Sequence, residues 1–129
     1  METAELNLLA GWIGMSGGAI SGALIGLYFY KEQWMGGYGS FRRRLTRLGH
    51  ISFFGMGFIN LLFGLGLKVM PLSPLPAQIA SAAFVLGAVT MPLCCFLAAW
   101  RPSFRHLFPI PVVSVVVGIL GTLHGWPVK

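Results

Sequence analysis

The segment LLAGWIGMSGGAISGALIGLYFY, residues 8–30, decides the fold. It contains no charged side chain, and a helix of this length at 1.5 Å per residue measures about 35 Å, enough to cross a hydrocarbon core of about 30 Å. Because lipid offers the backbone no hydrogen-bond partners, such a segment crosses as a helix that satisfies its own amides. The sequence therefore predicts a membrane-spanning helix here. We expect it to be retained, since no basic segment precedes it as in a cleavable signal peptide.

Three further apolar runs follow, at about 50–70, 77–100 and 107–126. The composition agrees with four spans, because 56% of the residues are hydrophobic and only 9% are charged, whereas about a quarter are charged in soluble domains. We therefore expect an all-α fold, an integral membrane four-helix bundle formed by a single domain, residues 1–129.

Prolines and one serine indicate where the helices begin and bend. The stretch MPLSPLPAQ, residues 70–78, predicts a tight non-helical connection, because its three prolines lack amide donors. Pro92 predicts a bend within the third span. Pro109 and Pro111 fall in the opening turns of the fourth span, where proline is tolerated. Ser40 is predicted to cap the helix that carries the arginines.

The distribution of basic residues predicts the orientation. Of nine Lys and Arg, those that lie in the connections after the first and third spans are Lys31, Arg42, Arg43, Arg44, Arg47, Arg101 and Arg105. Only Lys68 and Lys129 lie on the other side. Loops rich in Lys and Arg face the cytoplasm, so we expect both termini outside, in a bacterial inner (cytoplasmic) membrane.

The same basic connections indicate partners. Arginines beside a span bind anionic lipid headgroups, each charge contributing about 1 kcal/mol near such a surface. We expect this contact, or docking of an acidic cytoplasmic partner, for Arg42, Arg43, Arg44, Arg47, Arg101 and Arg105. No nucleic acid is expected.

Glycines predict how the helices pack. In the first span they recur at every fourth position: Gly14, Gly18, Gly22 and Gly26. Such a face lets another helix approach closely, and close van der Waals contact supplies much of helix association in lipid. The second span offers a matching stripe of His50, Phe54, Gly57, Leu61 and Gly64. We expect the two to pack, within the bundle or in a complex, with Asn60 hydrogen-bonding across helices for about 1 kcal/mol.

Catalytic and metal sites are not predicted. The whole acidic inventory is Glu2, Glu5 and Glu32, none of them within a span, which argues against a proton-coupled carrier and against carboxylate catalysis. It also removes the usual ligands of Mg²⁺ and Ca²⁺. Adjacent Cys94 and Cys95 point about 100° apart on a helix, so we interpret them as small apolar filler.

Two histidines suggest a cofactor. His50 opens the second span and His106 precedes the fourth, at similar depth on the cytoplasmic side. Two imidazoles from different helices can hold a b-type haem through both axial positions, with the arginines neutralising its propionates. A quinone is another candidate ligand for the same residues. The alternative is that both histidines bond to headgroups or loop carbonyls.

Three functional hypotheses follow. Four spans with a basic stretch leading into Gly49 and His50 are similar in organisation to small subunits of respiratory and other redox membrane complexes. An accessory subunit that packs against other membrane proteins is therefore the leading hypothesis. The second is a haem- or quinone-binding redox protein that uses His50, with or without His106. The third is a small oligomeric carrier or channel in which Asn60 and Thr90 line a path.

Overall fold

The computed structural model describes residues 1–127, so Lys129, which entered the charge comparison, lies outside them. Its long helices are α1 (Thr3–Tyr28), α2 (Phe41–Val69), α3 (Pro74–Trp100) and α4 (Pro109–His124). Two short helical turns, η1 (Trp34–Gly36) and η2 (Pro102–Leu107), lie in the connections. The described residues form no strand. With η2 leading into α4, four helical segments are long and apolar enough to cross a membrane, which confirms the predicted all-helical class.

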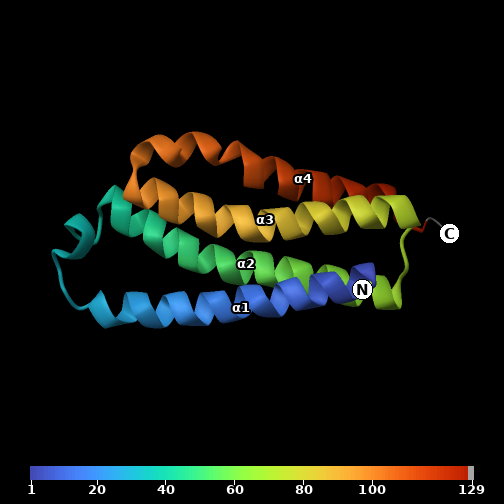
Figure 1. The fold of residues 1–129 in the computed structure, drawn as a ribbon, viewed down its shortest axis with the longest axis horizontal. Coiled ribbons are helices and arrows are strands. Elements are labelled where there is room, and N and C mark those ends of the chain that lie inside the picture. The colour runs from blue at the N-terminus through green and yellow to red at the C-terminus, as the bar shows by residue number, and fades with distance from the viewer. Residues whose placement is uncertain (128–129) are drawn as a thin grey trace.

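The four helices lie side by side in chain order, with α1 at one edge and α4 at the other (Figure 1). Each helix packs against its neighbour in sequence, and α1 also reaches α3. α4 rests mainly on α3. The N-terminus and the C-terminal end of α4 lie at the end opposite the two basic connections (Figure 1). The array is therefore open, in contrast to a closed bundle in which the first and fourth helices meet.

Two helix starts differ from the sequence expectation. α1 begins five residues before the predicted span, at Thr3, where the backbone N–H of Glu2 donates to a carboxylate oxygen of Glu5 at 3.3 Å. α3 begins at Pro74, inside the stretch predicted to be non-helical. Pro74 and Pro76 fall in the first turn, where amide groups have no partner within a helix, so their missing donors remove nothing.

Glycines of α1 receive the side chains and backbone of α2. A Cβ atom at Gly14 would lie 3.2 Å from the Phe53 carbonyl oxygen and 3.3 Å from Gly57 Cα. At Gly18 and Gly22 it would collide with the rings of Phe54 and His50. α2 thus meets α1 through the stripe predicted for it.

Gly26, predicted to belong to the same packing face, does not. A Cβ there would meet no atom within 4 Å. Each fourfold step rotates a residue about 40° around a helix of 3.6 residues per turn, so Gly26 has turned about 120° away from Gly14. Toward the N-terminus of α1, Gly11 extends the contact with α2, because a Cβ atom there would collide with the Leu61 side chain.

A buried polar triad joins the first three helices. Asn7 Nδ2 donates to Asn60 Oδ1 at 2.7 Å, and the Ser81 hydroxyl donates to Asn7 Oδ1. Asn60 Nδ2 donates in turn to the carbonyls of Met56 and Phe84, at 2.9 and 3.1 Å. The three side chains are at most 1% exposed. Since an unpaired amide is costly in hydrocarbon, these hydrogen bonds fix the register of α1, α2 and α3.

We predict that Asn60→Leu lowers the free energy of unfolding by about 1 to 2 kcal/mol, because Asn7 then loses its acceptor and the Phe84 carbonyl its donor. Unfolding by sodium dodecyl sulfate in mixed micelles, followed by circular dichroism, measures the change. Thr90→Val is the control, since the Thr90 hydroxyl donates only to the Leu86 carbonyl of its own helix, at 2.7 Å. Equal unfolding curves for the two variants would contradict the prediction.

Candidate functional site at the basic end

The connection between α1 and α2 folds around the side chain of Arg43, which is only 2% exposed. Its Nη2 donates to the Phe29 carbonyl at 2.7 Å, and its Nη1 donates to the carbonyls of Lys31 and Glu32 at 3.3 and 3.2 Å. The last carbonyls of a helix have no partner within it. Arg43 of α2 therefore closes the end of α1 and shapes the residues that follow.

Aromatic rings complete the surroundings of Arg43. The guanidinium carbon lies 4.6 Å from the ring centroid of Phe29 and 5.5 Å from those of Trp34 and Tyr38. Ring faces attract a cation at such distances. Charge compensation for Arg43 thus comes from carbonyl dipoles and π-faces, and its Nε has no hydrogen-bond partner among the described residues.

Ser40 holds the connection in place. Its hydroxyl oxygen accepts from the backbone N–H of Arg43 at 3.1 Å, which confirms the predicted N-cap, and its hydroxyl donates to the Met35 carbonyl at 2.6 Å. Met35 has a φ of 54°, followed by Gly36 and Gly37 at 86° and 93°. A side-chain-bearing residue rarely adopts such a φ, so the Ser40 contact stabilises a tight turn that brings the aromatic rings to Arg43.

The placement of Arg43 corrects an expectation. Arg43 was predicted to contact lipid or a partner together with the other arginines, and its burial removes it from that surface. Residues on a helix differ by about 100° in direction per position, so the run RRR at 42–44 cannot face one way. Arg44 points outward and is exposed, while Arg43 points at the end of α1.

The remaining arginines gather at the same end of the array. Arg42 of α2 donates from Nε to the Ala99 carbonyl in the last turn of α3, at 3.1 Å. Arg47 lies 4.1 Å from the ring centroid of Tyr38, and Arg101 lies 5.5 Å from that of Trp100. Both basic connections thus present guanidinium groups on one surface, together with the exposed Arg44 and Arg105.

The structure does not bring His50 and His106 together. His50 is half-buried against α1, with Nδ1 3.2 Å from the Ser21 hydroxyl and its ring packed on Gly22 and Phe54. His106 is exposed on η2, whose neighbours are α3 and α4. No group of three or more His, Cys, Asp or Glu that could hold a metal occurs among residues 1–127. Two axial imidazoles for one haem are therefore not in place.

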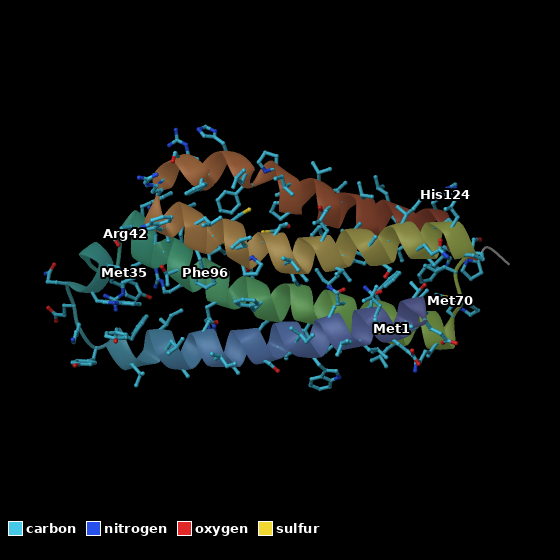
Figure 2. The ribbon with its side chains drawn as sticks, in the orientation of Figure 1. Met1, Met35, Arg42, Met70, Phe96 and His124 are labelled. Carbon is cyan, nitrogen blue, oxygen red and sulfur yellow. The ribbon has the colours of Figure 1, made fainter. Side chains whose placement is uncertain are left out.

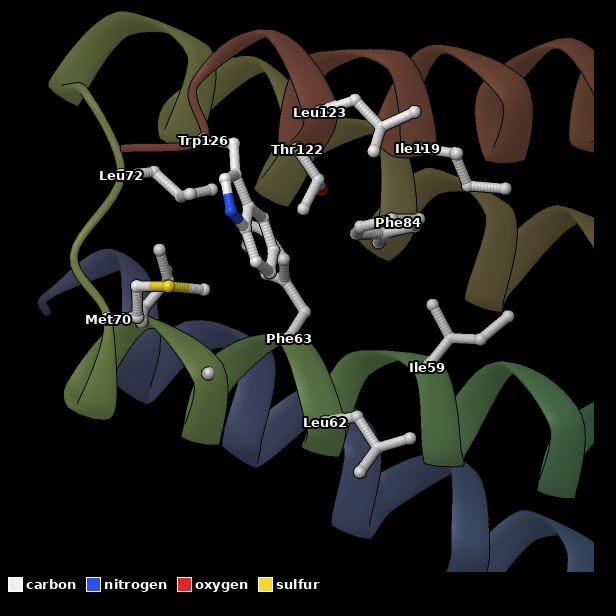
Figure 3. A pocket seen from close by; sticks show the side chains of 12 residues that line it. Ile59, Leu62, Phe63, Met70, Leu72, Phe84, Ile119, Thr122, Leu123 and Trp126 are labelled. Carbon is white, nitrogen blue, oxygen red and sulfur yellow. The ribbon is translucent and has the colours of Figure 1, made fainter. Parts of the chain in front are cut away.

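Two apolar crevices open between the helices. The α2/α4 crevice, of about 420 Å³, lies beside Phe63, Phe84 and Ile119, and the ring of Trp126 points into it (Figure 3). The Thr122 hydroxyl at its wall is satisfied by the Gly118 carbonyl. The α1/α3 crevice, of about 500 Å³, is lined by apolar side chains and glycine alone. Neither presents the convergent polar groups of a catalytic pocket.

Sequence reasoning missed two members of the buried triad. Asn7 was placed outside the first span and Ser81 was not singled out. The signal for Asn7 was present, because it precedes Gly11 and Gly14 by four and seven residues and so shares their face of α1.

Comparisons of the chain with protein-family models, with curated proteins and with solved structures found no match.

We predict that Arg43→Met lowers the free energy of unfolding by about 2 to 4 kcal/mol, because three carbonyls lose a charged donor. The loosened connection should also be cut faster by trypsin after Lys31. The control is Arg44→Met, which removes the same charge from an exposed position. Cleavage rates and unfolding curves in detergent are measured side by side, and a variant pair that behaves alike would contradict the role assigned to Arg43.

Proposed function

We propose that the chain is a small polytopic membrane subunit that packs against other membrane proteins as an accessory subunit of a redox or energy-converting membrane complex. The described residues contain no acid–base pair or metal cluster that would favour an enzyme. The class of complex in this proposal comes from the similarity in organisation to small subunits of redox complexes.

The observation that carries the proposal is a pair of glycines on the open side of α2. Gly55 and Gly66 are exposed, and a Cβ atom at either would meet nothing within 4 Å. They are eleven residues apart and so lie within about 20° of each other around the helix. Glycine destabilises a helix interior by about 0.5 to 1 kcal/mol relative to alanine. Packing within this chain does not require them, whereas close approach of another helix does.

The open array supports the same proposal. α1 and α4 are edges with broad exposed apolar faces, and α4 rests mainly on α3. In a complex these edges can continue into the helices of neighbouring subunits, while the exposed arginines remain available to anionic lipid or to an acidic cytoplasmic partner.

The carrier hypothesis has less support. That hypothesis assigned Asn60 and Thr90 to a solute path. Both side chains already form hydrogen bonds within the protein, Asn60 in the triad and Thr90 with the Leu86 carbonyl. A path for polar solutes needs such groups free to replace water.

We predict that Gly55→Leu combined with Gly66→Leu abolishes recovery of the partner subunits from native membranes, because side chains then block close helix contact. Tagged protein is purified in mild detergent, and its companions are identified by mass spectrometry. Ala82→Leu, at an exposed position of α3, is the control and should retain the partners. A wild-type protein recovered only as a free monomer would count decisively against the subunit role.

We further propose that both termini face outward and both basic connections face the cytoplasm, in a bacterial inner membrane. The proposal is supported by the basic residues gathered at one end of the array. In a chain with Cys94 and Cys95 replaced by alanine, Glu5→Cys should react with a membrane-impermeant maleimide on intact spheroplasts. Ser103→Cys should react only after the membrane is opened, and the reverse pattern would refute this orientation.

A further inference from the structure

The α1/α3 crevice ends beside aromatic side chains near the basic connections. Phe53 of α2 and Phe96 of α3 line its inner end, with ring centroids 6.1 Å apart. Toward the half away from the basic connections, its walls include Leu9 and Ile13 of α1 and Val85 of α3. The crevice therefore runs along the span as an apolar channel, open on its side to the surrounding hydrocarbon.

Arg42 lies beyond the end of this crevice, against the last turn of α3. It is eleven residues before Phe53 and so lies within about 20° of it on the same face of α2. Its Nε donates to the Ala99 carbonyl, and Ala99 follows Phe96 by three residues, about 4.5 Å along the axis. Figure 2 shows Arg42 and Phe96 in the half of the array that carries the basic connections.

Two guanidinium groups lie by the last turn of α3. The bond from Nε to Ala99 fixes the Arg42 side chain, which is exposed, and its Nη1 and Nη2 have no hydrogen-bond partner within residues 1–127. Arg101 follows Ala99 by two residues and is exposed, with its guanidinium over the Trp100 ring. Trp100 is itself 65% exposed, as expected of a ring at headgroup depth.

We propose that this crevice and these arginines form a binding site for one anionic phospholipid. The phosphate lies against Arg42 and Arg101, which can donate charge-assisted hydrogen bonds in a fork, and one acyl chain occupies the crevice between α1 and α3. A zwitterionic lipid carries an ammonium group that the same guanidiniums repel. The site goes beyond the proposed subunit role and rests only on the basic end lying at a membrane surface.

The full-length protein in detergent tests this by native mass spectrometry, titrated with palmitoyl-oleoyl phosphatidylglycerol and, separately, with the matching phosphatidylcholine. We expect one phosphatidylglycerol to bind about tenfold more tightly than phosphatidylcholine. Inorganic phosphate tests whether the anion alone binds, and dihexanoyl phosphatidylglycerol tests whether the headgroup binds without a long acyl chain. Neither should displace the long-chain lipid. Equal affinity for the two long-chain lipids, or displacement by phosphate, overturns the proposal.

Variants assign the site to these residues. Arg42→Gln should weaken phosphatidylglycerol binding about fivefold, while Arg44→Gln, which removes the same charge from another face, should leave it unchanged. Ala88→Phe, which fills the crevice, should abolish binding of the long-chain phosphatidylglycerol, and Val116→Phe at an exposed position of α4 should not.

Because Arg42 also holds Ala99, Arg101→Gln serves as a second test in case Arg42→Gln fails to fold. It should weaken binding with the melting temperature of the lipid-free protein unchanged. Equal loss in the Arg44 and Arg101 variants would mean diffuse attraction to the basic end and would overturn the specific site.

Discussion

The hydrogen bonds among Asn7, Asn60 and Ser81 are the constraint on which the arrangement of the helices depends. Lipid tails are as apolar as leucine, so nothing comparable to the hydrophobic effect in water presses apolar helices together. Glycine contacts allow α1 and α2 to approach, but a smooth glycine face does not by itself fix their register. The triad does, because a shift of one turn would leave buried amide groups without partners. It also reaches α3, so three helices share one register.

The array is open because the polar triad joins only three of the four helices. Every member of the triad belongs to α1, α2 or α3, whereas the polar side chains of α4 bond within their own helix: Ser114 to Ile110 and Thr122 to Gly118. Along its length α4 therefore packs on α3 through apolar contacts such as Gly118 with Phe84, and a backbone hydrogen bond from Ser73 to the Gly125 carbonyl joins the two only at the end of α4. The α2/α4 crevice and the exposed glycines of α2 lie on the side that this arrangement leaves uncovered.

Sequence patterns predicted the parts of the fold that local physics decides. The length of the apolar runs predicted the four helices. Ser40 predicted where α2 begins, and the stripe of residues on α2 predicted its contact with α1. The predictions that were wrong depended on how far a residue is rotated around its helix, or on partners that are distant in sequence. Gly26 follows the fourfold spacing yet turns away, because four residues exceed one helical turn. Among the candidate site residues, Arg43 could not be separated from its neighbours by composition, since the carbonyls that bind it belong to a connection whose path only the folded chain defines. The separation of His50 from His106 likewise depends on the order of the helices in space.

Arg42 and Arg43 show why charge alone does not describe the basic end. The two residues are adjacent and identical, but the helix directs them about 100° apart. The Arg43 guanidinium lies at the end of α1, where it donates hydrogen bonds to carbonyls, contacts aromatic rings and so stabilises the connection. The other is tied by a single bond to the end of α3 and keeps its outer donors free. Arg43 closes the end of α1 and Arg42 is bonded to the end of α3. The connection is therefore rigid where it presents its surface charge. In the lipid site that we propose, a fixed Arg42 guanidinium beside an apolar crevice binds a headgroup and an acyl chain together, which a mobile cluster of the same charges would not do.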